Sequence, residues 1–341
     1  MSVEPALDRM AMLAALGHTY GLTLDRLTFI PDGTTPAYRV EGQSGRYFLK
    51  VLIDTSYGGP LLDRLRAELP LLRSLVKRDI LPNVPHPVST LGGDDLTQIG
   101  GHWVVLYRWI EAETLSASWE ASLPELGALL GRLHAATPLI LEDISRLPMP
   151  PETFDLPFER QFLLDWKRLH EETHPAVQAF RDLLTPLEPL VFSVLNHAQA
   201  LQEHARGHAG TQVVCHTDAH GGNVMRDQTG ALWIIDWETA RLAPPEHDLW
   251  MVHARLPEVL AAYREATQRP FRPDLGLMSF YMVRRVLEDL AVDLNAVLNA
   301  QFTDERRWES HRLLDGWIIP SLRRVEAEIA HLTRVLSPTG P

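Results

Sequence analysis

The hydrophobic positions of the first 52 residues change from a helical to a strand-like period. Residues 5–16 carry leucine and methionine at helical spacing and stop at Gly17, which predicts a helix capped by that glycine. Three short β-like pieces follow at 27–30, 37–40 and 46–52, and the turn-forming runs PDGTT and EGQSG separate them. The pattern predicts an antiparallel meander with tight turns.

Leucines then recur every three or four residues between Pro60 and Lys77. This spacing predicts an amphipathic helix, although Pro70 must kink or restart it, because proline lacks the N–H that a helix interior uses. A second pair of strands is expected next, ending in HWVVLYRWI at 102–110. Up to this point the chain reads as a small sheet with one helix.

Beyond residue 113 the pattern becomes mainly helical. The run SLPELGALLGRLHAAT opens with a predicted capping box from Ser122 to Glu125, in which each side chain would bond the other residue's backbone N–H. Helical patterns then dominate 157–206 and 246–336, with short strands between them. We therefore expect an N-terminal lobe over 1–108, a larger, mainly helical lobe over 109–336 and a frayed tail over 337–341.

Composition and charge narrow the class of protein. The 341 residues contain 32 basic and 44 acidic side chains, a formal charge of −12, which argues against binding to nucleic acid or an anionic membrane and suits a cationic small substrate. The one cysteine, Cys215, excludes an intrachain disulfide framework. With no signal-peptide pattern and no apolar run of about 18 residues, we expect a cytoplasmic protein without an obligate protein partner.

Polar residues cluster where a buried strand should end. The run VVCHTDAHGGNVM at 213–225 passes from apolar residues directly to His216, Asp218, His220 and Asn223. Eighteen residues beyond Asp218, the run LWIID ends in Asp236. Two short strands joined by a hairpin-like turn at RDQTG would bring Asp218, Asn223 and Asp236 into one small volume.

Such a set of oxygen donors suits phosphoryl transfer. This reaction needs Mg²⁺ to neutralise phosphate charge, a carboxylate to orient the attacking hydroxyl and a lysine to hold the phosphates. Mg²⁺ prefers hard oxygen ligands, which the Asn223 amide and the Asp236 carboxylate offer. Asp218 is then left to act on the nucleophile.

The run HTDAHGGN at 216–223, together with IIDWE at 234–238, resembles the signature of the aminoglycoside phosphotransferase family, a kinase-like group that includes choline and related small-molecule kinases. With LAPPEHDL and RVLEDLAV, these runs are most similar to members that act on spectinomycin. The resemblance covers most of the chain. It implies an α+β, protein-kinase-like fold of two lobes, with ATP and Mg²⁺ as cofactors and a hydroxyl of a small cationic molecule as phosphate acceptor.

The same resemblance implies roles for individual residues. Asp218 would be the catalytic base or hydroxyl orienter, and Asn223 and Asp236 would bind Mg²⁺. Lys50 would contact the α- and β-phosphates, with Glu68 as its ion-pair partner. The remaining nucleotide contacts would come from backbone groups of Tyr107 to Trp109 in an interlobe hinge, and from Gly33, Thr34 and Thr35 in the loop PDGTTPAY.

The remaining expectations concern the residues that would contact the phosphate acceptor and two differences from protein-kinase motifs. Acidic side chains of Glu238, Glu288 and Asp289 would meet the cationic acceptor; equally, Glu288 and Asp289 could form a salt-bridged helix face with the neighbouring arginines. Thr217 stands where a protein kinase has the arginine that binds a phosphorylated loop, and DWE replaces DFG. A phosphate switch therefore has no cation to bind, and we expect an enzyme that is always assembled.

Three alternatives to this function stay open on the sequence. A metabolite kinase of the choline, homoserine or methylthioribose type would use the same scaffold. A metal-dependent hydrolase could use His216 and His220 as zinc ligands, but would leave Lys50 and Asp236 unexplained. A nucleotide-binding pseudokinase without turnover is disfavoured, because the lysine, both aspartates and the asparagine are all present.

Overall fold

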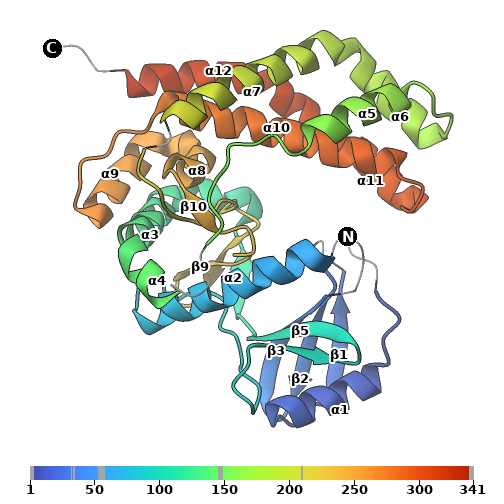
Figure 1. Ribbon diagram of the computed structural model, residues 1–341, viewed down its shortest axis with the longest axis vertical. Coiled ribbons are helices and arrows are strands. Elements are labelled where there is room, and N and C mark those ends of the chain that lie inside the picture. The colour runs from blue at the N-terminus through green and yellow to red at the C-terminus, as the bar shows by residue number, and fades with distance from the viewer. Residues whose placement is uncertain are drawn as a thin grey trace. The chain divides into compact units, whose positions relative to one another are not determined.

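Five antiparallel strands form a sheet in the N-terminal part of the chain (Figure 1). The structure is a computed structural model that describes residues 4–31, 33, 35–52, 58–144, 149–208 and 210–337. The sheet has the order β1-β2-β3-β5-β4 and so confirms the predicted meander and second strand pair. Its strands are β1 (Arg26–Ile30), β2 (Ala37–Gly42), β3 (Gly45–Leu52), β4 (Leu96–Ile99) and β5 (His102–Arg108).

Helix α1 (Arg9–Tyr20) begins later and ends later than its hydrophobic pattern predicts. The Asp8 carboxylate accepts hydrogen bonds from the N–H groups of Met10 and Ala11, which makes Asp8 the N-cap. The expectation that Gly17 caps the helix is wrong. Gly21 has the left-handed backbone, with φ 67°, and its N–H bonds to the Gly17 carbonyl, so the chain turns one helical turn further on.

Strand β3 turns its alternate side chains to opposite faces of the sheet. Leu49 and Val51 are buried in a core that also contains Leu16 of α1, while Lys50 points to the other face. Helix α2 (Gly58–Lys77) follows and runs through Pro70 as one helix, so the predicted restart at that proline is wrong. The alternation of β3 therefore separates the lysine from the core.

The segment before α3 (Leu123–Ala135) changes how that helix starts. A 3₁₀ helix, η1 (Ser116–Ser122), delivers Ser122 already in a helical backbone conformation, and its side chain makes no cap hydrogen bond. The predicted capping box is therefore wrong. Instead, the Arg226 guanidinium donates to the Ser122 hydroxyl at 2.9 Å and to the Glu125 carboxylate at 2.8 Å, which ties the start of α3 to a distant strand.

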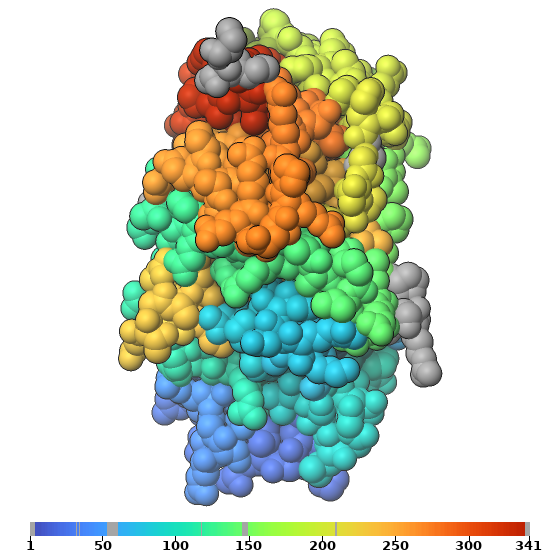
Figure 2. Space-filling view, turned by 90° about the vertical axis from the view of Figure 1, so that its left-hand side faces the viewer, coloured from blue at the N-terminus to red at the C-terminus, as the bar shows by residue number. Residues whose placement is uncertain are grey.

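Helix α4 (Thr137–Asp143) is held against the C-terminal end of α2. Asp143 accepts hydrogen bonds from the Ser74 hydroxyl at 2.9 Å and from two guanidinium nitrogens of Arg78 at 2.7 Å. These contacts hold the pKa of the Asp143 carboxyl well below its usual range. Figure 2 shows the two helices side by side on the surface, α2 in light blue and α4 in green.

Five short strands surround the polar cluster predicted from the sequence. Strands β6 (Ala112–Thr114), β8 (Val224–Asp227) and β9 (Leu232–Ile234) form one small sheet, and β7 (Val213–Cys215) pairs with β10 (Arg241–Ala243). In the first of these sheets Val224 lies opposite Ile234. The predicted hairpin across 226–230 is thereby confirmed.

The chain divides into two compact units. The first comprises Met1–Pro150, Val214–Leu242 and Ala262–Gln268, and the second comprises Pro151–Val213, Ala243–Ala261 and Arg269–Pro341. The segment at 214–242 thus packs with the N-terminal 150 residues, while the lobes at 1–108 and 109–336 remain a prediction.

The second unit is built from helices packed around α10 (Leu275–Leu298), whose side chains are buried along most of its length (Figure 1). Among the described residues, no helix combines the length and apolar composition needed to cross a bilayer. The helices in contact with α10 include α5 (Glu159–Leu169), α6 (Pro175–Leu184), α7 (Glu188–His208), α8 (Glu246–Leu249), α11 (Asp304–Leu313) and α12 (Ile319–Leu336).

Candidate functional site

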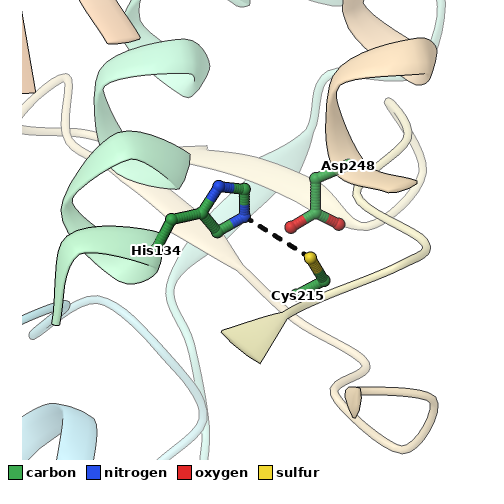
Figure 3. A group of neighbouring side chains, drawn as sticks. All are labelled: His134, Cys215 and Asp248. Carbon is green, nitrogen blue, oxygen red and sulfur yellow. Dashed lines mark hydrogen bonds between the residues drawn. The ribbon is translucent and has the colours of Figure 1, made fainter. Parts of the chain in front are cut away.

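Strand β7 leads into the candidate site and is fixed by the ends of α3 and α4. The buried Thr137 hydroxyl accepts a hydrogen bond from the Val214 N–H at 2.9 Å. From α3, the His134 ring points toward Cys215, with Nε2 3.7 Å from Sγ (Figure 3). Since Cys215 directly precedes His216, these contacts set where the polar loop begins.

Thr137→Val is expected to lower the free energy of unfolding by about 1–3 kcal/mol, because the buried Val214 N–H would lose its acceptor. Valine keeps the branched shape, so packing should change little. Thr137→Ser keeps the hydroxyl and is the matched control. Urea denaturation of the three proteins measures the difference, and equal stabilities for the valine and serine variants would contradict the assignment.

His216 has a structural role at the start of the loop. Its Nε2 lies 2.9 Å from the Ile235 carbonyl oxygen, to which it donates, and its Nδ1 accepts from the Asp218 N–H at 3.2 Å. The ring also meets Trp237 edge to face, at 4.6 Å between centroids. With both ring nitrogens bonded within the protein, neither lone pair is directed at a zinc ion, which speaks against the hydrolase alternative.

Asn223 is hydrogen-bonded directly to Asp218. Its amide nitrogen donates to the Asp218 backbone oxygen at 2.9 Å and lies 3.3 Å from Oδ2 of the same residue. Its backbone oxygen accepts from the Ile235 N–H at 2.9 Å, next to Asp236. Because the amide nitrogen faces Asp218, the amide oxygen is the atom left for a cation.

Asp236 follows β9 in a strained backbone conformation. Its φ is 65°, a left-handed value that costs a non-glycine residue about 1–2 kcal/mol and that surrounding contacts must hold. Partial burial raises the pKa of its carboxyl; the charge of Lys50 opposes the shift, whereas those of Glu238 and Asp218 add to it. The predicted catalytic carboxylate, Asp218, and the predicted metal ligand, Asp236, therefore lie near enough to influence each other.

Lys50, on β3, contacts carboxylates of this cluster. Its Nζ lies 2.6 Å from Oε2 of Glu238 and 3.8 Å from Oδ1 of Asp236. Burial alone would lower the pKa of the lysine, yet the charges of Glu68, Glu238 and Asp236 raise it above its ordinary value. Lys50 is therefore a cation held by carboxylates, as a phosphate-binding lysine needs to be.

Glu68 lies in the same electrostatic cluster but has a different hydrogen-bond partner. The Tyr107 hydroxyl donates to Glu68 Oε1 at 3.0 Å, and burial raises the pKa of Glu68 to about 7 against the opposing charge of Lys50. Sequence reasoning thus missed Glu238 as the nearest carboxylate to the lysine. The signal was the acidic third residue of DWE, which the sequence placed near the metal and assigned to the acceptor.

The other predicted nucleotide contacts lie on the connection between β1 and β2 and at the end of β5. Gly33, with φ 97°, and Thr35 belong to the connection between β1 and β2, and Thr34 lies outside the described residues. After β5, the Trp109 N–H donates to the Arg46 carbonyl at 3.1 Å. That N–H is therefore engaged within the protein, and adenine binding by this backbone stays a prediction.

The acidic residues of α10 belong to the second unit and are paired. The Glu288 carboxylate lies 2.7 Å from the Arg284 guanidinium, and the Asp289 carboxylate lies 3.0 Å from that of Arg285. The salt-bridged helix face that the sequence offered as an alternative is confirmed. An acceptor contact from either acid stays a prediction, and it would have to be made beside an arginine that already neutralises the carboxylate.

Comparison with known proteins gives a consistent result. Residues 26–281 match the sequence model of the phosphotransferase enzyme family. A solved structure of spectinomycin phosphotransferase with ADP and spectinomycin has a TM-score of 0.75 at 19% identity, covering 94% of this chain and 99% of that one. Choline kinase from Streptococcus pneumoniae has a TM-score of 0.55 at 15% identity, covering 94% and 98%.

A third structure, the macrolide 2′-phosphotransferase of Brachybacterium faecium, has a TM-score of 0.54 at 18% identity and covers 91% of this chain and 98% of that one. At these identities the likeness shows the fold, which is the α+β, protein-kinase-like fold that the sequence predicts. The family model adds the class of reaction. The chain belongs to the phosphotransferase enzyme family.

Proposed function

We propose that the protein transfers the γ-phosphoryl group of Mg²⁺-ATP to a hydroxyl of a small, amine-bearing molecule. One observation carries the proposal. Asn223 is hydrogen-bonded to Asp218, and the charge of Asp218 acts on Asp236. Lys50, on β3, forms an ion pair with Asp236. The set contains a carboxylate for the nucleophile, two hard oxygen donors for a cation and one cation for phosphate.

The donor set fits a magnesium ion. The amide oxygen of Asn223 and the carboxylate of Asp236 would hold it, and bound there it supplies neutralisation of the charge that develops on the β- and γ-phosphates. Asp218 would accept a hydrogen bond from the attacking hydroxyl and orient it toward the phosphorus. Its backbone and side chain are already positioned by the bond to Asn223 and by the His216 ring.

Lys50 would exchange partners when the nucleotide binds. Its Nζ is 2.6 Å from Glu238, and the α- and β-phosphates would take over that contact. The released Glu238 carboxylate would then face the phosphates or an acceptor cation. Since the lysine is held by three carboxylate charges before binding, it stays protonated and ready to bind phosphate.

The acceptor class is proposed from charge and from the structural likeness. The formal charge of −12 favours cationic small molecules, and the similar spectinomycin phosphotransferase was solved with spectinomycin. We therefore propose an aminoglycoside or aminocyclitol such as spectinomycin as the acceptor.

Measurement of ADP formation with Mg²⁺-ATP and a panel of acceptors tests the function. The panel contains spectinomycin, other aminoglycosides, choline, homoserine and methylthioribose, with mass spectrometry of the product. We expect phosphorylation of an amine-bearing sugar or aminocyclitol. Turnover with choline, homoserine or methylthioribose alone would overturn the amine-bearing sugar or aminocyclitol as acceptor, and ATP binding without phosphorylation of any acceptor would overturn the kinase proposal.

A further inference from the structure

We propose that the hydroxyl groups of Thr217 and Thr239 form a positioning pair that sets the spacing between Asp218 and Asp236. Neither threonine belongs to the set of residues assigned above to base, metal or phosphate. The inference rests on the proposed function, because it assigns the pair to that site. It concerns the contact between two loops of the first unit.

Three hydrogen-bond contacts define the pair. The Thr217 hydroxyl lies 3.1 Å from the backbone oxygen of Thr239 and 3.0 Å from its hydroxyl oxygen, and donates toward them. The Thr239 hydroxyl donates in turn to the His216 backbone oxygen at 3.3 Å. Each threonine therefore binds the other's loop, rather than its own.

The position of this link relative to the carboxylates gives it a function. Thr217 directly precedes Asp218, and Thr239 comes three residues after Asp236. A second link, from the His216 ring to the Ile235 carbonyl, lies just before Asp236. Asp236 is thus held on both sides. Loss of the threonine link would leave the Thr239 end of the following segment with the bond from the Ala240 N–H to the Trp237 oxygen, while Trp237 and Glu238 keep their contacts with His216 and Lys50.

The backbone of Thr217 supplies an independent reason to assign a role to its hydroxyl. Its φ is 74°, in the left-handed region, and it is 7% exposed. A β-branched side chain is poorly suited to this conformation, for which glycine or asparagine is suited. A strained threonine at this place is explained if its hydroxyl makes hydrogen bonds that glycine, without a side chain, cannot make.

The test compares Thr217→Val, Thr217→Ser, Thr239→Val and the double valine variant. Valine keeps the branched shape and removes the hydroxyl, whereas serine keeps it. We expect kcat to fall about tenfold in each valine variant with a much smaller change in the KM for ATP, since a misplaced catalytic group slows the chemical step. The serine variant should retain kcat within about twofold.

The double valine variant separates a pair from two independent residues. The two side chains share one contact, between their hydroxyls, and both act on the same two loops, so the double variant should lose more than either single variant but less than the product of both losses. Thr333→Val, which removes an exposed hydroxyl bonded within α12, is the matched control and should leave kcat unchanged. Multiplicative losses, or wild-type kcat in Thr217→Val, would overturn the proposal.

Hydrogen–deuterium exchange of the nucleotide-free proteins gives a readout that needs no turnover. Thr217→Val should increase exchange at the Ala240 N–H and its neighbours, and Thr217→Ser should not. Unchanged exchange in the valine variant would overturn the link even if the protein proves to be a kinase. Increased exchange with an inactive wild-type protein would instead support the link and count against the proposed function alone.

Discussion

Asp218→Asn is expected to reduce kcat by about 10²–10⁴-fold, the usual contribution of a positioned general base, while ATP affinity stays near that of the wild type. Asparagine has the same shape as aspartate but accepts the hydroxyl proton far less readily. The backbone oxygen of residue 218 would still bond to Asn223, so the loop should keep its form. Single-turnover kinetics measure the chemical step, and calorimetry measures ATP binding.

Asp227→Asn is the control for this variant. Asp227 lies on β8 in the same hairpin region and accepts hydrogen bonds from Thr229 and Trp233, contacts that lower the pKa of its carboxyl to about 2. Its replacement removes the same charge without touching the proposed base. We expect a lower free energy of unfolding but an unchanged rate of the chemical step. Wild-type rates in Asp218→Asn would remove that residue from its role.

Local patterns predicted the elements, and contacts with distant parts of the chain decided their details. The periods of two and of three to four residues placed the sheet, α2 and α3 correctly. The errors occurred at the ends of α1 and α3 and at Pro70 inside α2. Nothing near Ser122 indicates that its hydroxyl binds Arg226, 104 residues away, instead of its own helix. Likewise, Gly17 and Gly21 both suit a helix end, and only the observed backbone, left-handed at Gly21, distinguishes them.

In the candidate site, too, the sequence predicted contacts between near neighbours along the chain and missed those between distant residues. Asp218, Asn223 and Asp236 were grouped correctly because a short hairpin joins them, so spacing along the chain carried the information. The ion pair between Lys50 and Glu238 joins residues 188 positions apart, and no spacing rule reports it. The link between Thr217 and Thr239 was missed for a related reason, since nothing in HTDAHGGN marks a left-handed threonine.

For the acidic residues of α10, the motif resemblance and the local charge pattern make different predictions. RVLEDLAV resembles a family segment, yet arginines four residues before Glu288 and Asp289 occupy both carboxylates. The spacing of four residues is enough to predict these pairs. Local charge patterning therefore described these side chains more completely than the resemblance did.

Asp236→Asn is expected to weaken productive binding of Mg²⁺-ATP by about a hundredfold or more, since the metal contributes several kcal/mol of charge stabilisation. Asparagine is a better substitution than alanine at this position, because it tolerates the left-handed backbone that Asp236 adopts. Lys50 keeps Glu238 as its 2.6 Å partner, so the nucleotide-free fold should persist. The KM for ATP and the Mg²⁺ concentration at half-maximal rate are the quantities to measure.

The same variant separates a metal ligand from a residue that matters for the fold alone. The Asp236 side chain is 45% exposed, so exchanging its carboxylate for an amide should change the free energy of unfolding little. Urea denaturation of the nucleotide-free proteins measures that difference. Unchanged Mg²⁺ dependence, whatever the stability of the variant, would contradict the metal assignment, because the assignment requires a ligand to be lost from the ion.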